Sequence, residues 1–249
     1  MKKLRKRSIV AIRELEFRYA NGEYSLRIPE LTIAEGEKLF LYGPSGSGKS
    51  TLLSLIAGIL IPQHGTINVL DRDLKTMSSK ERDRFRGEHL SIIFQEFNLL
   101  PFLSVRDNVR LPLDLFPSRM GPATKISQTP DAHIVAKSDD AKGVLCDLML
   151  QRLGLSDIAH RKASDISRGQ AQRAAAARAL IGRPNLILAD EPTSSLDTDA
   201  TESFLATLFK QMQQSRAALI FVSHDRSLKK RFDRAVDLTS LISSQTRNV

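Results

Sequence analysis

Apolar and polar residues alternate in short runs over residues 9–42, a pattern typical of half-buried strands. Asn21-Gly22 and Glu35-Gly36-Glu37 separate the runs and carry turn-forming residues. The pattern predicts a strand meander that leads into a glycine-rich loop after Tyr42. A helix is predicted directly after this loop, over residues 50–60, because the spacing is helical and Pro62 follows.

Further along the chain, strand-like and helix-like segments alternate. The predicted strands are 66–70, 90–95, 186–190, 219–223 and 235–238, and the predicted helices are 78–86, 141–153 and 170–180. Alternation of this kind favours a parallel sheet covered by helices. We therefore expect an α/β fold with a mainly parallel sheet, an N-terminal antiparallel β subdomain and an inserted helical subdomain near residues 98–170.

Local composition suggests how the chain is divided. We expect a single domain over residues 8–245, preceded by a basic extension over residues 1–7. Residues 117–140 contain Pro, Gly, Ser, Thr and Asp with little periodicity, so this segment is predicted to be a loop or a mobile insertion. The polar tail over residues 243–249 is expected to be disordered.

The composition narrows the class of protein. The 249 residues are 41% hydrophobic, which is enough for a full core, and the single cysteine, Cys146, excludes an intrachain disulfide. Cys146 is expected to be a buried, inert thiol in a reducing compartment. No run approaches the roughly 18 to 20 apolar residues of a membrane-spanning helix, and the basic start lacks the apolar stretch of a signal peptide. We expect a cytosolic protein.

The formal net charge of +9 favours an acidic partner. Nucleic acid, an anionic lipid surface and phosphorylated ligands all fit, and so does a solvated basic face with no specific partner. Charge alone does not decide between them. Sequence motifs are needed to identify the ligand and the reaction.

One motif occupies the glycine-rich loop. Its residues are Gly43, Pro44, Ser45, Gly46, Ser47, Gly48, Lys49 and Ser50, and they fit the P-loop pattern between a predicted strand and a predicted helix. The glycines allow backbone N–H groups to converge on phosphate oxygens, Lys49 reaches the β- and γ-phosphates, and the Ser50 hydroxyl ligates magnesium. A plain glycine turn before a helix is the alternative. The motif predicts a P-loop NTPase core but does not distinguish kinases, GTPases, motors and transport ATPases.

A second motif is a pair of carboxylates, Asp190 and Glu191, at the end of the apolar strand 186–190. Open α/β sheets bind ligands at the carboxyl ends of their strands. Asp190 is suited to hold magnesium, and Glu191 to polarise the water that attacks the γ-phosphate. The alternative is two surface acids at a strand end, which the presence of the P-loop disfavours.

A third motif, Ser167-Arg168-Gly169-Gln170, stands directly before the alanine-rich helix. Ser167 is predicted to cap that helix, and the N–H groups that follow are placed to receive an anion. Taken alone, this motif is best explained as an ordinary N-cap. The motif ends 20 residues before Asp190, however, and this spacing favours a functional role over a plain N-cap.

Together these motifs resemble the nucleotide-binding subunit of ABC transporters, over residues 15–238. The resemblance implies that Tyr19 stacks on adenine and that residues 43–50 are the Walker A loop. It identifies Gln95 as the glutamine that contacts magnesium and the membrane subunit, and residues 166–170 as the signature motif. Walker B is then residues 186–191, the D-loop is residues 194–197 with Asp197, and His224 is the switch histidine that senses the γ-phosphate.

The motifs and the family resemblance together predict one set of site residues. The catalytic residues are Glu191 and His224; the nucleotide-binding residues are Tyr19, Gly43, Pro44, Ser45, Gly46, Ser47, Gly48, Lys49, Ser50, Thr51, Gln95, Ser167, Gly169, Gln170 and Asp197; and the magnesium ligands are Ser50, Gln95 and Asp190. The cofactors expected are ATP and Mg²⁺.

The resemblance also implies partners. In the family, the signature motif of one subunit closes over ATP held by the other, which predicts a homodimer with ATP between its two copies. A separate integral membrane permease is the second partner expected, and the chain is placed at the cytoplasmic face of the inner membrane as a peripheral protein. Lys2, Lys3, Arg5, Lys6 and Arg7 are candidates for contact with anionic lipid.

The segment 93–109 resembles the subgroup of this family that serves lipoprotein release, macrolide export and cell division, which indicates export or mechanotransmission. Its apolar residues are expected to form a partly exposed groove for a helix of the permease, with a core role as the alternative: Phe97, Leu99, Leu100, Phe102 and Leu103.

One position departs from the family pattern. Arg168 replaces the first glycine of the signature pair, while the serine and the second glycine are kept. A working but altered site is expected, so Arg168→Gly is predicted to change the ATPase rate or dimerisation.

Two other functions compete with the transport ATPase. An ABC-type ATPase acting on nucleic acid or ribosomes fits the charge, but such relatives usually carry tandem nucleotide domains, zinc modules or long coiled coils, and this sequence shows none of them. A P-loop kinase or a non-hydrolysing regulatory ATPase is disfavoured by Glu191, His224 and the signature motif. We expect no nucleic-acid partner.

Overall fold

The computed structural model describes residues 7–20, 22, 25–120, 140–194, 196–213 and 215–243. The chain divides into two compact units. The first unit comprises 1–86, 185–191 and 216–249, and the second comprises 87–184 and 192–215. The predicted single domain over 8–245, with a helical subdomain at 98–170, stays a prediction. The basic residues 1–6 and most of the polar tail lie outside the described residues.

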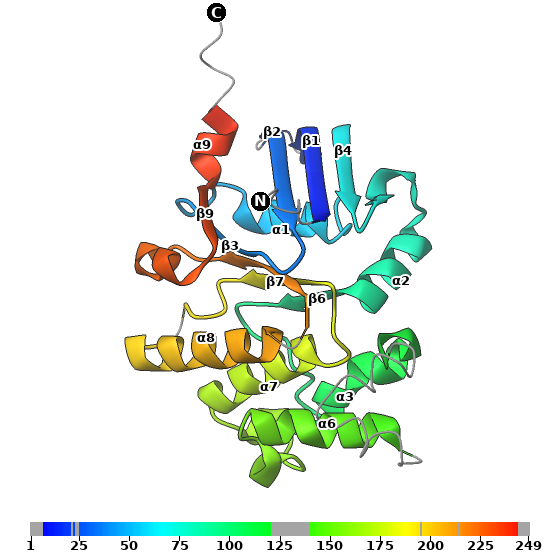
Figure 1. The fold of residues 1–249 in the computed structure, drawn as a ribbon, viewed down its shortest axis with the longest axis vertical. Helices are drawn as coiled ribbons and strands as arrows, with labels where there is room; N and C mark the ends of the chain where they lie inside the picture. The colour runs from blue at the N-terminus through cyan, green and yellow to red at the C-terminus, as the bar shows by residue number, and fades with distance from the viewer. Residues whose placement is uncertain are drawn as a thin grey trace, which may run out of the picture. The chain divides into compact units, whose positions relative to one another are not determined.

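The first unit contains an antiparallel sheet built from the alternating segments (Figure 1). Its strands are β1 (Ser8–Arg18), β2 (Ser25–Ala34), β4 (His64–Val69) and β5 (Arg72–Asp73), in the order β2-β1-β4-β5. Ile12, Leu15 and Phe17 of β1 are buried while Arg13 and Arg18 are exposed. The period-2 pattern therefore places one face of the sheet in the core.

A bulge interrupts the pairing of β1 with β4. The register of the two strands shifts between Arg13 and Glu16, and Glu14 adopts a positive φ of 48°. Opposite the bulge, Gly65 has φ +76°, and a Cβ atom there would lie 2.2 Å from the carbonyl oxygen of Glu14. The close approach of the two backbones therefore requires glycine at this position.

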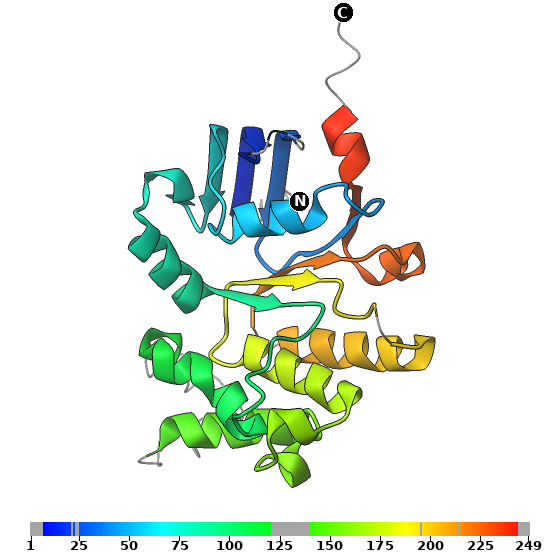
Figure 2. The same ribbon diagram turned by 180° about the vertical axis from the view of Figure 1, so that it is seen from behind.

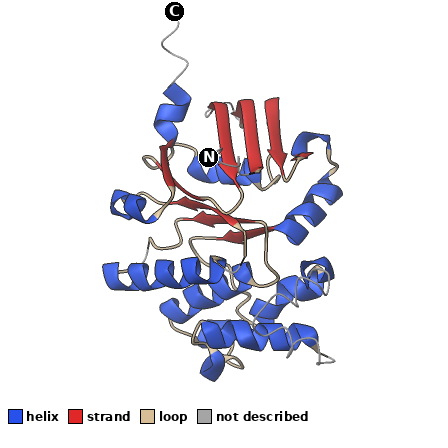
Figure 3. Cartoon of the chain, viewed as in Figure 1, coloured by secondary structure: helices blue, strands red, loops and turns tan. Residues whose placement is uncertain are grey.

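The first unit also holds four parallel strands, drawn in red with the antiparallel strands in Figure 3. They are β3 (Lys38–Tyr42), β7 (Leu186–Asp190), β8 (Ala218–Val222) and β9 (Arg234–Asp237), in the order β7-β8-β3-β9. The prediction of one meander over 9–42 is wrong at β3, which pairs with β8 and β9 instead. Phe40 and Leu41 are adjacent and both fully buried, as expected for a strand with two covered faces.

Helices complete the first unit. Helix α1 (Lys49–Ile56) contacts strands β4 and β7, one from each sheet, and it ends earlier than predicted because Gly58 turns the chain with φ +67°. Helix α2 (Ser79–His89) follows a short turn at Leu74–Thr76, and its last three residues belong to the second unit. Helix α9 (Leu238–Ser243) follows β9. A 3₁₀ segment, Arg226–Arg231, joins β8 to β9.

The second unit is mainly helical (Figure 1 and, from behind, Figure 2). It contains β6 (Leu90–Ile93), α3 (Val105–Leu115), α6 (Ala141–Arg152), α7 (Arg168–Leu180) and α8 (Thr198–Met212), with short 3₁₀ turns at Ser156–Ile158 and Ala163–Asp165. Helix α3 packs against α6 and α7, and α7 also packs against α8. Apolar residues from α3, α6 and α7, among them Val109, Leu150 and Ala177, form one buried cluster.

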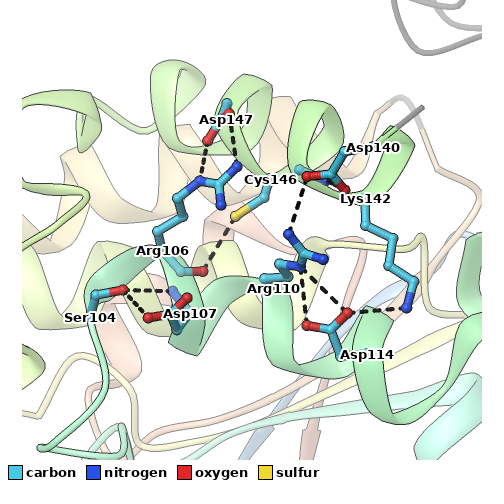
Figure 4. A network of polar contacts seen from close by, with 10 residues as sticks. Ser104, Arg106, Asp107, Arg110, Asp114, Asp140, Lys142, Cys146 and Asp147 are labelled. Carbon is cyan, nitrogen blue, oxygen red and sulfur yellow. Dashed lines mark hydrogen bonds and ion pairs between the residues drawn. The ribbon is translucent and has the colours of Figure 1, made fainter. Parts of the chain in front are cut away.

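Ion pairs join α3 to α6 on the surface of this core (Figure 4). Arg106 donates to both carboxylate oxygens of Asp147, at 2.7 and 3.1 Å. Arg110 contacts Asp114 at 3.1 Å and Asp140 at 3.2 Å, and Asp140 caps α6 by accepting from the Gly143 N–H. Solvent screens surface pairs of this kind, so each of them contributes little to stability.

The start of the predicted irregular segment 117–140 is ordered. Pro117–Met120 forms a 3₁₀ turn, and the buried guanidinium of Arg119 donates to the carbonyl oxygens of Gly87 at 2.7 Å and of Leu90, and to the Ser91 hydroxyl at 3.0 Å. Burial lowers the pKa of Arg119 to about 10. Residues 117–120 therefore differ from the predicted loop, and residues 121–139 lie outside the described part of the chain.

Cys146 is buried in the α3–α6 core, as predicted. Burial raises the pKa of its thiol to about 12 from an ordinary value of 9.0. The native thiol is therefore expected to react with a thiol reagent at pH 8 at least about 100-fold more slowly than the thiol of the unfolded chain, measured by stopped-flow labelling.

The same shift predicts a dependence of stability on pH. The unfolded thiol loses its proton above pH 9 while the folded thiol keeps it, so its stabilising contribution is complete below pH 9 and is lost as the pH rises towards 12. Urea unfolding at pH 8 and 10 should show a steeper loss of stability for the wild type than for Cys146→Ala. Equal slopes would contradict the shift.

Candidate functional site

The glycine-rich loop connects β3 to α1 in the first unit. Gly46 and Gly48 have φ of +74° and +97°, in the left-handed region that favours glycine, so both are required by the shape of the loop. The buried Lys49 donates from Nζ to the carbonyl oxygens of Gly43 at 3.0 Å and Pro44 at 2.9 Å. Its positive charge therefore lies inside the loop.

Asp190 ends β7 next to the start of α1. Its carboxylate accepts a hydrogen bond from the Ser50 hydroxyl. Burial raises the pKa of Asp190, the nearby Glu191 raises it further, and the Ser50 hydrogen bond and the Lys49 charge oppose the rise. Ser50 and Asp190, the two predicted magnesium ligands of the first unit, are thus in contact. Among the described residues, no group of three or more His, Cys, Asp or Glu is placed to hold a metal ion.

Glu191 and His224 face each other across the ends of two adjacent parallel strands. Glu191 Oε2 lies 2.9 Å from His224 Nδ1, and the Glu191 side chain is 21% exposed against 63% for His224. Glu191 has a positive φ of 45°, and its N–H donates to the Val222 carbonyl oxygen at 3.0 Å. The pairing of β7 with β8 therefore places a half-buried carboxylate beside an exposed imidazole.

The segment after His224 is held against β3 by Tyr42. Lys229 Nζ lies 3.5 Å from the centre of the Tyr42 ring, and the Arg226 guanidinium lies 5.2 Å from it. Tyr42 also stacks with Phe40 at 5.9 Å. Sequence reasoning missed these contacts, since the only signal was an aromatic residue before the loop and cations after the histidine.

Tyr19 and Thr51 also lie together in the first unit. The Tyr19 hydroxyl and Thr51 Oγ1 are 3.2 Å apart, and the Tyr19 ring packs edge-on against Phe17 at 4.8 Å. Tyr19 remains 39% exposed. A partly exposed aromatic ring thus lies beside the start of α1, and an aromatic ring of this kind is suited to stacking on a planar base.

The second unit holds the remaining predicted site residues. Gln95 is exposed in the turn after β6. Ser167 caps α7 in a complete capping box, in which its hydroxyl accepts from the Gln170 N–H at 3.3 Å and Gln170 Oε1 accepts from the Ser167 N–H at 2.8 Å. A Cβ atom at Gly169 would meet nothing within 4 Å, so the backbone of this turn is open to an incoming group.

Two other residues of the second unit have clear local roles. Asp197 caps α8, since its carboxylate accepts from the Ala200 N–H at 2.7 Å, and this helix had not been predicted. Arg168 lies 3.9 Å from Glu96, and both side chains are more than half exposed, so the pair is weak.

The apolar residues after Gln95 are divided between core and surface. Phe97 is buried, which corrects the expectation that it lines an exposed groove, while Phe102 is 69% exposed. Leu99 is partly buried against the α3–α6–α7 cluster. The structure thus brings Tyr19, Thr51, the loop, Asp190, Glu191 and His224 together in the first unit and assigns Gln95, Ser167, Gly169, Gln170 and Asp197 to the second.

Comparisons with known proteins give the same class. The family profile described as "ABC transporter" matches residues 26–194. The lipoprotein-releasing system ATP-binding protein LolD of Hydrogenovibrio crunogenus is 34% identical over 236 residues, covering 93% of this chain and 94% of that protein. The uncharacterized ABC transporter ATP-binding protein YbbA of Escherichia coli K12 is 34% identical, covering 94% and 95%.

A solved structure agrees with the fold. The ATP-binding cassette MJ0796, a dimer in a post-hydrolysis state bound to ADP and Pi, superimposes with a TM-score of 0.73 at 28% identity, covering 92% of this chain and 93% of that one. The chain therefore belongs to the ABC transporter family. It is an ATPase subunit of that family with a P-loop NTPase fold, which confirms the predicted fold class and activity.

Proposed function

We propose that this chain binds Mg-ATP between two copies of itself and uses hydrolysis to drive a separate membrane permease. The observation that carries the proposal is the cluster of Lys49, Ser50, Asp190, Glu191 and His224 at the carboxyl ends of neighbouring parallel strands. Open sheets of this kind bind ligands at that edge.

The loop supplies the phosphate site. Its backbone N–H groups and the N-terminus of α1 attract negative charge, and Lys49 adds a cation. Tyr19 offers its exposed ring to adenine, and Thr51 stands beside it. The proposed binding therefore uses backbone dipoles for the phosphates and the Tyr19 side chain for the base.

Magnesium fits the residues present. Ser50 and Asp190 present hard oxygen donors that already contact each other. The family resemblance alone adds Gln95 as a proposed further ligand. When bound, the ion would neutralise charge on the phosphates. Burial that raises the pKa of Asp190 also makes this carboxylate favour a nearby cation.

Glu191 is proposed to act as the general base. It is half-buried, fixed by the Val222 contact and oriented by His224, so its free carboxylate oxygen is positioned for a water molecule. His224, more exposed, is proposed to sense the γ-phosphate while its Nδ1 keeps Glu191 in place. Tyr42, through Lys229, steadies the segment that carries His224.

A second copy would complete the site. Ser167, Gly169 and the open N-terminus of α7 are proposed to close over the ATP of the other copy, and Asp197 to lie at the interface. The dimer of MJ0796 bound to ADP and Pi supports a dimer of this chain that holds nucleotide. Hydrolysis would then release the two copies from each other.

The permease contact is proposed at the loop over residues 100–104. Buried Asn108 holds this loop, since its Oδ1 accepts from the Leu100 N–H at 2.8 Å and its Nδ2 donates to the carbonyl oxygens of Leu100 and Ser104, both at 3.0 Å. The loop therefore displays Phe102 on a rigid support. A rigid, exposed aromatic residue is a typical anchor for a protein partner.

The transported substrate is proposed to be a lipoprotein or another membrane-embedded cargo. The LolD relative is named for a lipoprotein-releasing system, and the identity of about one third extends over nearly the whole chain. No described helix has the length and apolar character to cross a membrane. We propose that the chain sits at the cytoplasmic face of the inner membrane through its permease.

Phosphate release by the purified chain, with ATP and Mg²⁺, tests the catalytic part of this proposal. Copurification in mild detergent from the native host tests the transport part. The expected result is ATP hydrolysis together with an integral membrane protein in the complex. Absence of hydrolysis would refute the first part, and a nucleic acid or ribosome as the sole partner would refute the second.

Phe102→Ala is expected to weaken the permease complex by about tenfold or more, because burial of a phenylalanine in an interface stabilises by roughly 2 kcal/mol. Titration of tagged variants against detergent-solubilised permease measures the change. Ile59→Ala is the matched control, since Ile59 is also exposed but lies in the first unit after α1. Equal losses for both variants would contradict docking at Phe102.

A further inference from the structure

The turn directly after Gln95 is strained. Phe97 and Asn98 are consecutive residues with φ of 61° and 48°, in the left-handed region. This conformation costs roughly 1 to 2 kcal/mol for a residue with a Cβ atom, although asparagine tolerates it better than phenylalanine. Such a turn persists only where its surroundings hold it.

Two backbone hydrogen bonds close the turn around Gln95. The Phe97 N–H donates to the Phe94 carbonyl oxygen at 3.0 Å, and the Asn98 N–H donates to the Glu96 carbonyl oxygen at 2.7 Å. The buried Phe97 ring anchors one side. The orientation of Gln95 therefore depends on this turn.

Arg178, near the end of α7, reaches the turn. Its Nη1 donates to the Asn98 carbonyl oxygen at 2.7 Å and its Nη2 to the Phe97 carbonyl oxygen at 2.6 Å. Hydrogen bonds from a charged donor are about twice as strong as neutral ones. Arg178 is partly buried, which lowers its pKa, and its guanidinium donates to two successive carbonyl groups of the strained turn.

We propose that Arg178 is a positioning residue that fixes the turn at Phe97 and Asn98, and thereby orients Gln95 and couples it to the helix that begins at Ser167. The inference rests on the proposed role of Gln95. Arg178 and the signature turn lie on the same helix, α7, which is roughly 20 Å long at 1.5 Å per residue. A displacement at its signature end is therefore transmitted by Arg178 to the Gln95 turn.

Steady-state ATPase assays of the full chain test this with two variants. Arg178→Met removes both donors and keeps the bulk, whereas Asn98→Val changes only an exposed side chain but places a β-branched residue at φ 48°. Each is expected to lower kcat by about tenfold or more with little change in KM for ATP, because the phosphate loop belongs to the first unit.

The control and the double variant sharpen the test. Asn98→Gly, which adopts a positive φ without strain, should keep the wild-type kcat. Arg178→Met combined with Asn98→Val should be no worse than the more impaired single variant, because both act on one turn. Circular dichroism and thermal melting show whether each variant folds.

The outcomes separate this inference from the proposed function. A wild-type kcat in Asn98→Val, whether or not Arg178→Met folds, would overturn the positioning role. So would losses that multiply in the double variant. A wild-type chain without ATP hydrolysis would instead refute the proposed function, whereas hydrolysis that is insensitive to these substitutions would refute the positioning role alone.

Discussion

Glu191→Gln is expected to lower ATP turnover by roughly 10²- to 10⁴-fold, the usual contribution of a general base. Glutamine keeps the size of the side chain and retains a group that contacts His224 Nδ1, but it cannot accept a proton from water. Phosphate release measures the turnover. The folded structure should be unchanged, because the Glu191 N–H bond to Val222 involves only the backbone.

The same substitution should make the ATP-bound dimer accumulate, since hydrolysis is the step proposed to separate the two copies. Light scattering with and without ATP measures the dimer. Glu30→Gln is the matched control, because Glu30 is exposed on β2. A Glu191→Gln protein that stays monomeric and turns over at the wild-type rate would remove Glu191 from the catalytic role.

Gly65→Ala is expected to destabilise the protein by about 3 kcal/mol, the sum of a left-handed backbone cost and the cost of overpacking. The new methyl group would lie 2.2 Å from the Glu14 carbonyl oxygen, so β1 and β4 would have to separate at the bulge. Urea unfolding followed by circular dichroism measures the loss.

Gly36→Ala provides the comparison. Gly36 has nearly the same φ, +72°, but a Cβ atom there would meet nothing within 4 Å. Only the backbone cost remains, so about 1 kcal/mol is expected. The difference between the two losses of stability measures the cost of the close contact between β1 and β4. Equal losses would show that the bulge rearranges to make room for the methyl group.

Features set by neighbouring residues were predictable from sequence. The loop at 43–50 and the acids at the end of 186–190 each lie in one continuous segment of sequence with the strand that precedes them. The strand and the phosphate-binding or acidic residues could therefore be identified together. The same holds for the Ser167 cap, where the serine and Gln170 stand three residues apart. The local sequence is sufficient to predict such features.

Features set by distant partners were not predictable. The sheet to which β3 belongs depends on β8, about 180 residues later, and an apolar strand gives no sign of its neighbour. Arg119 looked like part of a polar loop, yet its donors reach Gly87 and Leu90, about 30 residues earlier. Phe97 was expected at the surface because its hydrophobic run gives no periodicity that separates core from groove.

The buried thiol of Cys146 makes this chain a ready background for spectroscopic labelling. It is the only cysteine in the sequence, and the packing of α3 against α6 keeps it from reagents. A single Phe102→Cys substitution would therefore give one rapidly reacting site without removal of the native cysteine. Spin labels or dyes attached there in both copies would report how far apart the two proposed permease contacts lie as ATP is bound and hydrolysed.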